Sequence, residues 1–183
     1  VWDPPLRSAA ARRSNCEKGG AAVEIERRWL TDGWPEGTPS ARWHMDQGYL
    51  CTRPAVRIRR EAREGGETRY VLCVKGGGGL VREEVELPLS GADYARLAAL
   101  LSGPMIQKEQ RRYPLPGGLT LEVNAVDPAL ETGFFYAEVE FPTEAAARAW
   151  APPEAWADYL SRETTGQPGE SMAAYWARTR PCP

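Results

Sequence analysis

The sequence predicts an α+β fold in which a small, closed, antiparallel β-barrel carries helices on its outside. Short segments alternate charged and apolar residues with the two-residue period of a β-strand, and turns rich in Gly and Pro separate them. A few other segments have the periodicity of amphipathic helices, which need an apolar surface to pack on. If these helices cover the apolar side of the strands, the charged side must be the inside of a closed barrel.

Strand character occurs in eight segments of the chain. They are residues 23–30, 43–51, 56–60, 68–75, 80–89, 106–113, 119–126 and 134–141. Helical spacing is expected in residues 91–101, in a helix that Thr143 caps and that runs through Trp150, and in two short helices at 154–160 and 170–178. Since no domain boundary interrupts this order, residues 23–183 are expected to form one domain.

Five of the predicted strands carry charge along one whole face. These faces are Glu24/Glu26/Arg28, Arg57/Arg59, Lys75, Arg82/Glu84/Glu86 and Glu138/Glu140, and the strand through Glu122 and Asn124 adds to them. The alternative is a half-solvated sheet with ladders of salt bridges on its wet face. The same two-signed face on several strands favours an enclosed lumen, which persists only if it is wet, internally paired or built for a charged ligand.

The mixture of signs indicates the ligand that such a lumen would take. Clustered Arg and Lys suit phosphate oxygens, because guanidinium groups bind them in a bidentate manner. Paired carboxylates suit Mg²⁺ or Mn²⁺, which prefer oxygen ligands. A complex of a polyphosphate with Mg²⁺ or Mn²⁺ requires both kinds of side chain in one place, so we expect one of these metals as the cofactor.

The cysteines and the single histidine exclude several other classes of site. Cys16, Cys51, Cys73 and Cys182 form no CxxC pair, and His44 is the only histidine of the 183 residues. A zinc site of the usual Cys/His kind and a catalytic triad are therefore not expected. The scattered cysteines are interpreted as small buried apolar residues in a reducing cytoplasm.

Net charge and hydropathy narrow the range of partners. The net charge is −2, which indicates neither nucleic-acid nor membrane binding, and no segment has the roughly 20 apolar residues of a membrane span. A cytoplasmic protein that binds a small molecule is expected, and a homodimer stays open as its assembly.

Residues 1–22 differ from the rest of the chain, because they have no apolar periodicity. The Lys18-Gly19-Gly20 run can be encoded by a ribosome-binding sequence, and Val23 by a GTG start codon. One hypothesis is therefore that residues 1–22 are a mistranslated leader, and the alternative is a disordered tail.

The charged segments resemble, in order, the motifs of the CYTH superfamily, the triphosphate tunnel metalloenzymes. Residues 23–30, VEIERRWL, resemble its ExExK signature, and QGYL (47–50), VRIR (56–59), RxExE (82–86) and AEVEF (137–141) follow in the family's order. The resemblance covers Val23 to about Thr165. It implies an eight-stranded antiparallel barrel that forms a tunnel, as in inorganic triphosphatases, thiamine triphosphatases and a class of adenylate cyclases.

The resemblance also implies a role for each matching residue. Metal would bind to Glu24, Glu26, Glu138 and Glu140. Phosphates would bind to Arg28, Arg57, Arg59, Lys75, Arg82, Lys108 and Arg112. Glu84, Glu86 and Asn124 would line the tunnel. Arg28 would take part in catalysis, and Glu122 and Glu163 are the candidates for the carboxylate that orients water.

Three positions depart from the family pattern, and so does the segment after Thr165, which lacks the Tyr and Asn that usually follow there in the family. The lysine of ExExK is Arg28, Gln110 stands where lysine is usual with Lys108 as its substitute, and an aspartate is replaced by Asn124. The Glu163-Thr164-Thr165 run resembles the family's EVT. Asn coordinates metal weakly and cannot act as a base, so these changes bear on the substrate more than on the fold.

The expected activity is metal-dependent hydrolysis of a terminal phosphoanhydride, with inorganic tripolyphosphate as the substrate. Two alternatives stay open. The first is a class IV-type adenylate cyclase or a thiamine triphosphatase, whose substrate would need an aromatic slot, for example from Trp29, Trp34, Trp43 or Tyr49. The second is a non-catalytic polyphosphate-binding module.

Overall fold

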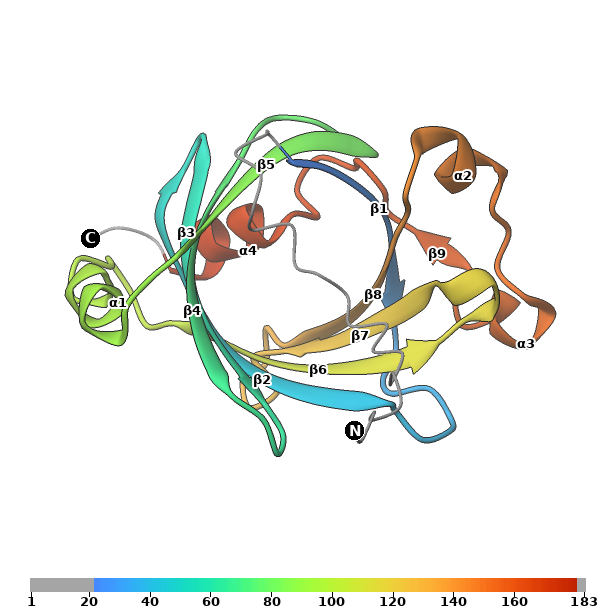
Figure 1. Ribbon diagram of the computed structural model, residues 1–183, viewed down its shortest axis with the longest axis horizontal. Helices are drawn as coiled ribbons and strands as arrows, with labels where there is room; N and C mark the ends of the chain where they lie inside the picture. Colours follow the sequence, from blue (N-terminus) through green and yellow to red (C-terminus); the bar gives the residue numbers. More distant parts are fainter. Residues whose placement is uncertain (1–21, 181–183) are drawn as a thin grey trace, which may run out of the picture.

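The protein is a closed antiparallel β-barrel, seen here in a computed structural model that describes residues 22–180 (Figure 1). The strands are β1 Ala22–Thr31, β2 Ala41–Thr52, β3 Ala55–Arg63, β4 Thr68–Lys75, β5 Val81–Pro88, β6 Ile106–Pro114, β7 Thr120–Val126, β8 Phe134–Glu140 and β9 Arg162–Glu163. The helices are α1 Gly91–Ala98, α2 Glu144–Ala149, α3 Glu154–Ala157 and α4 Met172–Thr179, with a short 3₁₀ turn, η1, at Pro116–Gly118.

Strand β1 closes the barrel by dividing its pairing along its length. The sheet runs in the order β5-β4-β3-β2-β6-β7-β8-β1, and a further antiparallel pairing joins β1 to β5. Residues 22–25 of β1 pair with β5, and residues 26–31 pair with β8. The prediction of a closed eight-stranded antiparallel barrel is confirmed, and the alternative of an open half-solvated sheet is wrong.

The two-residue strand β9 was not predicted from the sequence. It pairs with Trp29 and Leu30 of β1, beyond residues 22–25 of β1, which pair with β5. Two residues are too few to show a period, so only the tertiary structure reveals this strand.

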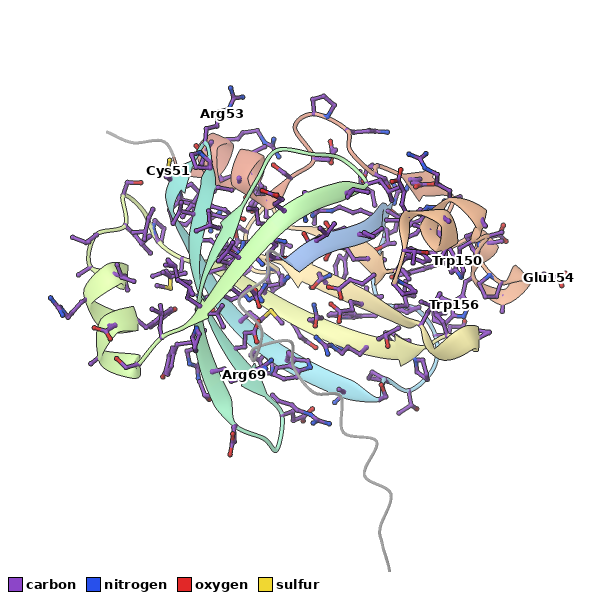
Figure 2. All side chains as sticks on the ribbon, turned by 45° about the horizontal axis from the view of Figure 1, so that its top comes forward. Cys51, Arg53, Arg69, Trp150, Glu154 and Trp156 are labelled. Carbon is purple, nitrogen blue, oxygen red and sulfur yellow. The ribbon has the colours of Figure 1, made fainter. Side chains whose placement is uncertain are left out.

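An apolar core lies on the outside of the barrel wall. Trp29, Leu121, Val139 and their neighbours on β1, β7 and β8 pack against Ala147 of α2 and against Leu160, which follows α3. The labelled Trp150 and Trp156 lie in this region, outside the strands (Figure 2). This arrangement confirms that helices cover the apolar side of these strands.

Helix α4 is an exception, because it packs against side chains that point into the barrel. Tyr49, Ile106 and Tyr136 have the same strand parity as the charged residues, and they form a second core with Met172 and Trp176 of α4. The prediction of peripheral helices is confirmed, but α4 lies at one end of the barrel and not against its outer wall. The physical reason is that the charged faces turn apolar toward one end of the barrel, and this helix covers that end.

The outer wall around α1 is only partly covered. Tyr94 of α1 packs on Tyr70, with 4.8 Å between the ring centroids. Gly48 leaves room for Leu101, which follows α1, since a Cβ at Gly48 would lie 2.3 Å from Cδ1 of Leu101. Farther along, Val85 and Leu87 of β5 are exposed. Helices thus cover part of the barrel wall and leave part of it bare.

Side chains cap three of the helices, as helix chemistry requires. Thr143 is the predicted N-cap of α2, and its hydroxyl accepts a hydrogen bond from the amide of Ala146 at 3.1 Å. Ser90 and Ser171 cap α1 and α4 in the same way. All four helices are shorter than the periodic segments that predicted them.

Two predictions concern cysteines and the chain termini. Cys51 is exposed and Cys73 is buried, so the interpretation of the cysteines as buried residues is wrong for Cys51, while Cys16 and Cys182 lie outside the described residues. The leader hypothesis for residues 1–22 also lies outside them, except for Ala22. Within residues 22–180, no helix is long and apolar enough to cross a membrane.

A buried ion pair holds the end of α4 to the barrel. Arg180 lies 2.6 Å from Asp127, which follows β7, and both side chains are nearly inaccessible to solvent. Asp127 also accepts hydrogen bonds from the Tyr175 hydroxyl and from the amide of Gln107, each at 2.8 Å. These contacts position the helix that closes the barrel end.

We expect Asp127→Asn to destabilise the protein by about 3 kcal/mol, because Arg180 keeps its charge in a buried position without a carboxylate. Urea denaturation followed by circular dichroism measures this change. The matched control is Asp32→Asn, which breaks the exposed pair with Arg162 and should cost less than about 1 kcal/mol. Equal costs for the two variants would show that the buried pair does not hold α4.

Candidate active site

The barrel encloses a cavity of about 620 Å³ whose wall includes residues of all eight long strands. Eight Arg or Lys residues and eight Glu residues line it, so its formal charge is balanced. The cations are Arg28, Arg53, Arg57, Arg59, Lys75, Arg82, Lys108 and Arg112; the acids are Glu24, Glu26, Glu61, Glu84, Glu86, Glu122, Glu138 and Glu140. Alternation along each strand explains the arrangement, because it sends every second residue inward.

On one side of the cavity the opposite charges are already paired. Glu24 lies 2.8 Å from the Lys75 ammonium and also pairs with Arg82. Glu84 lies 3.2 Å from Lys75 and 3.7 Å from Arg57. The other pairs are Arg59 with Glu61 and Glu86, at 2.5 and 3.3 Å, and Arg112 with Glu122, at 2.9 Å.

The pKa of Glu24 reflects this pairing. Burial acts to raise it, but the charges of Lys75 and Arg82 outweigh burial and hold the pKa well below its ordinary value. Glu24 is therefore a carboxylate at neutral pH.

On the β8 side the carboxylates outnumber their partners. Among residues 22–180, Arg28 is the only cation within 4.0 Å of the Glu138 carboxylate, at 3.9 Å, and Glu140 forms no ion pair. Glu26 and Glu140 are direct cross-strand partners. Burial, with repulsion from Glu138, raises the pKa of Glu26 to about 8, and burial, with repulsion from Glu122 and Glu24, raises that of Glu140 to about 7.

Several guanidinium groups in the wall have donors to spare. Nε and Nη2 of Arg28, Nε of Arg57 and Nε of Arg59 are buried and have no hydrogen-bond acceptor among the described residues. Buried donors without acceptors are costly. An anion with several oxygens would satisfy them.

Lys108 and Tyr136 form a further polar contact within the lumen. The Lys108 ammonium donates a hydrogen bond to the Tyr136 hydroxyl at 3.0 Å, and the Arg28 guanidinium lies 3.7 Å from the centre of the Tyr136 ring. Burial lowers the pKa of Lys108 to about 7, against the attraction of Glu138 and aided by repulsion from Arg59. Incoming negative charge would favour its protonated form.

The structure brings nearly all the predicted site residues to this one cavity. Its wall contains Glu24, Glu26, Arg28, Arg57, Arg59, Lys75, Arg82, Glu84, Glu86, Lys108, Arg112, Glu122, Glu138 and Glu140. It also contains Tyr49, which was a candidate for an aromatic slot, and Glu61 and Tyr136, which sequence reasoning did not assign to the site. Glu61 continues the alternation of Arg57 and Arg59, and that signal was available.

Two predicted residues lie elsewhere. Glu163, on β9, forms an ion pair with Arg27 at 2.6 Å and is exposed, and it does not line the cavity. Since Arg27 has the outward parity of β1, the expectation of Glu163 as a tunnel carboxylate is corrected. Asn124 does point inward, but it is fully buried behind Gln110, which donates a hydrogen bond to it at 3.0 Å.

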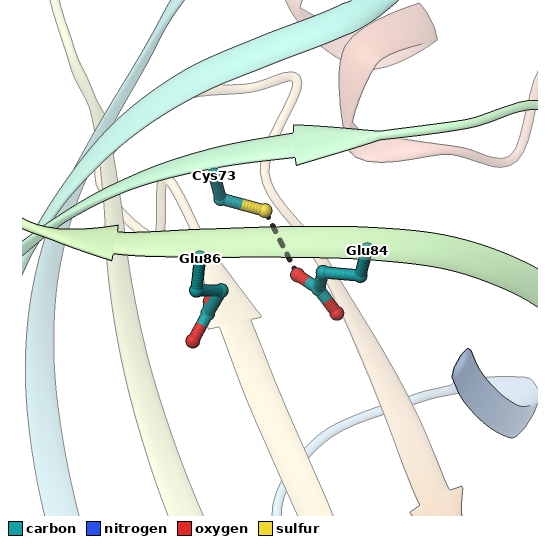
Figure 3. Close-up of side chains that lie close together, drawn as sticks. All are labelled: Cys73, Glu84 and Glu86. Carbon is teal, nitrogen blue, oxygen red and sulfur yellow. Dashed lines mark hydrogen bonds between the residues drawn. The ribbon is translucent and has the colours of Figure 1, made fainter. Parts of the chain in front are cut away.

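Cys73 is a polar neighbour of the lumen rather than an apolar filler. Its thiol donates a hydrogen bond to Glu84 at 2.8 Å, and Glu86 lies beside them (Figure 3). Burial, with the charge of Glu84, raises the pKa of Cys73 to about 11, so the thiol stays protonated. Ligand atoms of the three residues lie within 4.8 Å of one another, but Lys75 and Arg59 already neutralise the two carboxylates.

The β8 side fits a divalent cation better. Glu26, Glu138 and Glu140 offer oxygen ligands, which Mg²⁺ and Mn²⁺ prefer. The raised pKa values of Glu26 and Glu140, and the shortage of ion pairs around Glu138 and Glu140, are what a missing positive charge would produce. Glu24 fits such a set less well, because both Lys75 and Arg82 hold it, whereas Glu26 pairs with Arg82 alone.

Fold and cavity together define a β-barrel tunnel protein with a charged lumen of ligand size. No family model matches the chain. An inorganic triphosphatase from Nitrosomonas europaea is 34% identical over 131 residues, which are 72% of this chain and 84% of that relative. The chain therefore belongs to the CYTH superfamily, the triphosphate tunnel metalloenzymes, as its motifs predicted.

Solved structures have the same fold. Two structures of the protein NE1496, named in one case a hypothetical protein and in the other an inorganic triphosphatase, have TM-scores of 0.56 and 0.55 at 26% and 24% identity. They cover 83% and 86% of this chain and 96% of their own chains. HpAC1 from Hippeastrum, a putative adenylyl cyclase with a dominant triphosphatase activity, has a TM-score of 0.50 at 13% identity, over 85% of this chain and 95% of its own.

The raised pKa values predict how the stability of the metal-free protein depends on pH. Glu26 and Glu140 have an ordinary pKa of 4.5, and in the folded state about 8 and about 7. The folded state therefore binds more protons than the unfolded state in this window, and the stabilisation is lost as the pH rises. We expect the free energy of unfolding in EDTA to fall by at least about 2 kcal/mol from about pH 5 to about pH 8.

Urea denaturation at a series of pH values measures this dependence. Glu26→Gln should flatten the curve, whereas the matched variant at the exposed Glu64 should leave its slope unchanged. The lowered pKa of Glu24 acts at more acidic pH, and the lowered pKa of Lys108, about 7, opposes the fall only above about pH 7, so the net change from pH 5 to pH 8 keeps its sign. A wild-type stability that rises over this range would contradict the account of the β8 side.

Proposed function

We propose that this chain hydrolyses a small triphosphate, inorganic tripolyphosphate, within the barrel lumen and with Mg²⁺ or Mn²⁺ as its metal. One observation carries the proposal. Buried guanidinium donors without acceptors lie in the same cavity as carboxylates that lack enough cations. A polyphosphate brings the oxygens that the first group needs, and its metal brings the charge that the second group needs. The inorganic triphosphatase named above supports this choice.

The metal would be held by Glu26, Glu138 and Glu140. When bound, it supplies positive charge that offsets the charge on the phosphate oxygens. Metal binding would also hold these carboxyls in their ionised form, since a divalent cation favours carboxylate over carboxylic acid.

The phosphate chain would lie along the cationic wall. Arg57 and Arg59 come from β3, Lys75 from β4 and Arg112 from β6. Their current partners are glutamates at 2.5 to 3.7 Å, which phosphate oxygens would replace or share. Because these cations stand on rigid strands, they can stabilise the charge that develops on the transferring and leaving groups with little rearrangement.

The reaction is a hydrolysis of the terminal anhydride. A water oxygen forms a bond to the terminal phosphorus, the bond from that phosphorus to the bridging oxygen breaks, and the bridging oxygen leaves with its electron pair on pyrophosphate. Glu122, which lines the cavity, would accept the proton of the water. Burial raises its pKa, against the charge of Arg112, toward the range that suits a base. Arg28 would add charge near the reacting group.

The position of the aromatic residues favours an inorganic substrate. Of the four residues that were candidates for an aromatic slot, only Tyr49 lines the cavity. Trp29 packs on Trp150 outside the barrel, and Trp34 packs on Phe135. Trp43 is not part of the cavity wall, and the guanidinium groups of Arg69 and Arg112 lie over its ring. A nucleoside or thiazolium group would therefore find little aromatic surface to stack on.

Loss of a lumen carboxylate should remove the activity. Phosphate release from tripolyphosphate with Mg²⁺ or Mn²⁺, measured with malachite green, should fall at least about 100-fold in Glu24→Ala and in Glu138→Ala, because each change leaves cations or metal without their partner. The matched control Glu64→Ala should retain activity. Glu163→Gln should also retain it, since Glu163 lies outside the cavity.

A tight, metal-dependent interaction with tripolyphosphate without any release of phosphate would reject hydrolysis and establish the binding module. Calorimetric titration with tripolyphosphate, with and without Mg²⁺, separates these two cases. Equal activity of Glu138→Ala and wild type would place the reaction elsewhere.

A substrate panel tests the choice of triphosphate. We expect kcat/KM for tripolyphosphate to exceed that for ATP and for thiamine triphosphate by at least about tenfold, because the lumen offers charge and little aromatic surface. Activity confined to ATP, with pyrophosphate and cyclic AMP as products, would reject tripolyphosphate in favour of a cyclase.

A further inference from the structure

A second, smaller cavity of about 210 Å³ adjoins the tunnel, and we call it the side cavity. The two cavities share wall residues, which are Glu26, Arg28, Gly78, Arg82 and Ser171. The remaining wall comes from the glycine turn between β4 and β5 and from residues 164–170, which precede α4. Gly78, Gly166 and Gln167 on its wall are exposed, so the side cavity extends from the lumen wall to the surface.

Two glycines form the contact beside this opening. A Cβ at Gly166 would lie 3.1 Å from the Cα of Gly79, and a Cβ at Gly79 would lie 3.4 Å from the Cα of Gly166. Gly166 also has a φ of +68°, which other residues rarely adopt. The two loops thus approach each other backbone to backbone.

The inner end of the side cavity has buried donors without partners. Thr164 is 7% exposed and Arg28 is 9% exposed. The Thr164 hydroxyl and both Nε and Nη2 of Arg28 have no hydrogen-bond partner in residues 22–180. Burial of unpaired polar groups is costly, so their presence at a cavity wall indicates a polar ligand.

Two hydrogen bonds hold Arg28 to Thr164 and to the neighbouring Thr165. The amide of Thr164 donates to the carbonyl of Arg28 at 2.8 Å, and the amide of Arg28 donates to the hydroxyl of Thr165 at 3.0 Å. The pair is therefore a fixed part of the wall, with a hydroxyl and a guanidinium on neighbouring segments.

We propose that the side cavity is the exit route of the cleaved orthophosphate, and that Thr164 and Arg28 form an orthophosphate subsite at its inner end. This inference rests on the proposed function, since hydrolysis must supply the orthophosphate. Arg28 lines both cavities, so it can contact the orthophosphate in the tunnel and again in the side cavity. The pyrophosphate stays on the cationic wall of the tunnel while the smaller product leaves.

The charges around the side cavity fit a transient anion. Arg82 is already paired with Glu24 and Glu26, which leaves Arg28 as the cation with free donors. Glu26 and Glu170 are the acids of the wall. The negative charge of Glu170 opposes tight retention of phosphate, as an exit route requires.

Product inhibition tests the proposal. Orthophosphate that binds in the tunnel competes with tripolyphosphate, whereas orthophosphate in the side cavity binds while the tunnel is filled. Initial rates measured at several concentrations of tripolyphosphate and of orthophosphate should therefore show a noncompetitive component of inhibition by orthophosphate in the wild type. In Thr164→Val, which keeps the shape and removes the hydroxyl, the noncompetitive inhibition constant should rise about tenfold, while the competitive constant and KM stay unchanged.

Two variants serve as controls. Thr164→Ser keeps the hydroxyl and should restore the wild-type pattern. Thr31→Val removes a buried threonine hydroxyl at the far end of β1, outside both cavities, and should behave as wild type. Purely competitive inhibition in the wild type would overturn the proposal, and this result needs no variant to fold. An unchanged noncompetitive constant in a folded Thr164→Val would also overturn it.

Failure of the proposed function would be recognised separately. If the wild type releases no phosphate from tripolyphosphate, hydrolysis is rejected. Orthophosphate is then titrated by calorimetry into protein saturated with tripolyphosphate. Binding that Thr164→Val weakens about tenfold supports the subsite on its own, and the absence of binding overturns it.

Discussion

Sixteen ionisable side chains of opposite sign share one enclosed lumen, and the rest of the structure depends on their mutual compensation. A buried charge without a partner costs several kcal/mol, so neither the arginines nor the glutamates could line this cavity alone. Compensation is uneven, however. Pairing is close around Glu24 and sparse around Glu138 and Glu140. This uneven pairing fits the lumen for a ligand. A polyphosphate would accept hydrogen bonds from the unpaired guanidinium donors, and its metal would neutralise the unpaired carboxylates.

Strand β1 connects this electrostatic arrangement to the fold. Its first residues pair with β5 and place Glu24 opposite Arg82, and its later residues pair with β8 and place Arg28 opposite Glu138. The strand pairings that close the barrel therefore also assemble the charged wall. Residues 162–165 pair with the edge of β1 that lies opposite β8. This pairing brings Thr164 next to Arg28 and forms part of the wall of the side cavity.

Much of the fold and of the site could be predicted from the sequence. All eight long strands were predicted, and the charged faces of five of them, with the strand through Glu122, identified most of the residues that converge on the cavity. The family resemblance added Lys108 and Arg112. The predictions that differ have a common cause. Glu163 has the family's sequence context but stands on a two-residue strand outside the wall. Helix α4 has an ordinary amphipathic pattern, and its period does not reveal that its apolar face meets the inward side chains Tyr49 and Tyr136.

The sequence by itself determined which face of each strand is charged, because the two-residue period of a strand is a local property of the backbone. It also determined the class of ligand, because residue types carry their chemistry with them. Only the tertiary structure decided which charges meet. Closure of β1 on β5 sets the register between strands that are distant in the chain, and register, not composition, pairs Glu24 with Lys75 and leaves Glu138 with one remote arginine. The side cavity is a result of the same kind, since it exists only where two loops from distant segments meet at Gly79 and Gly166.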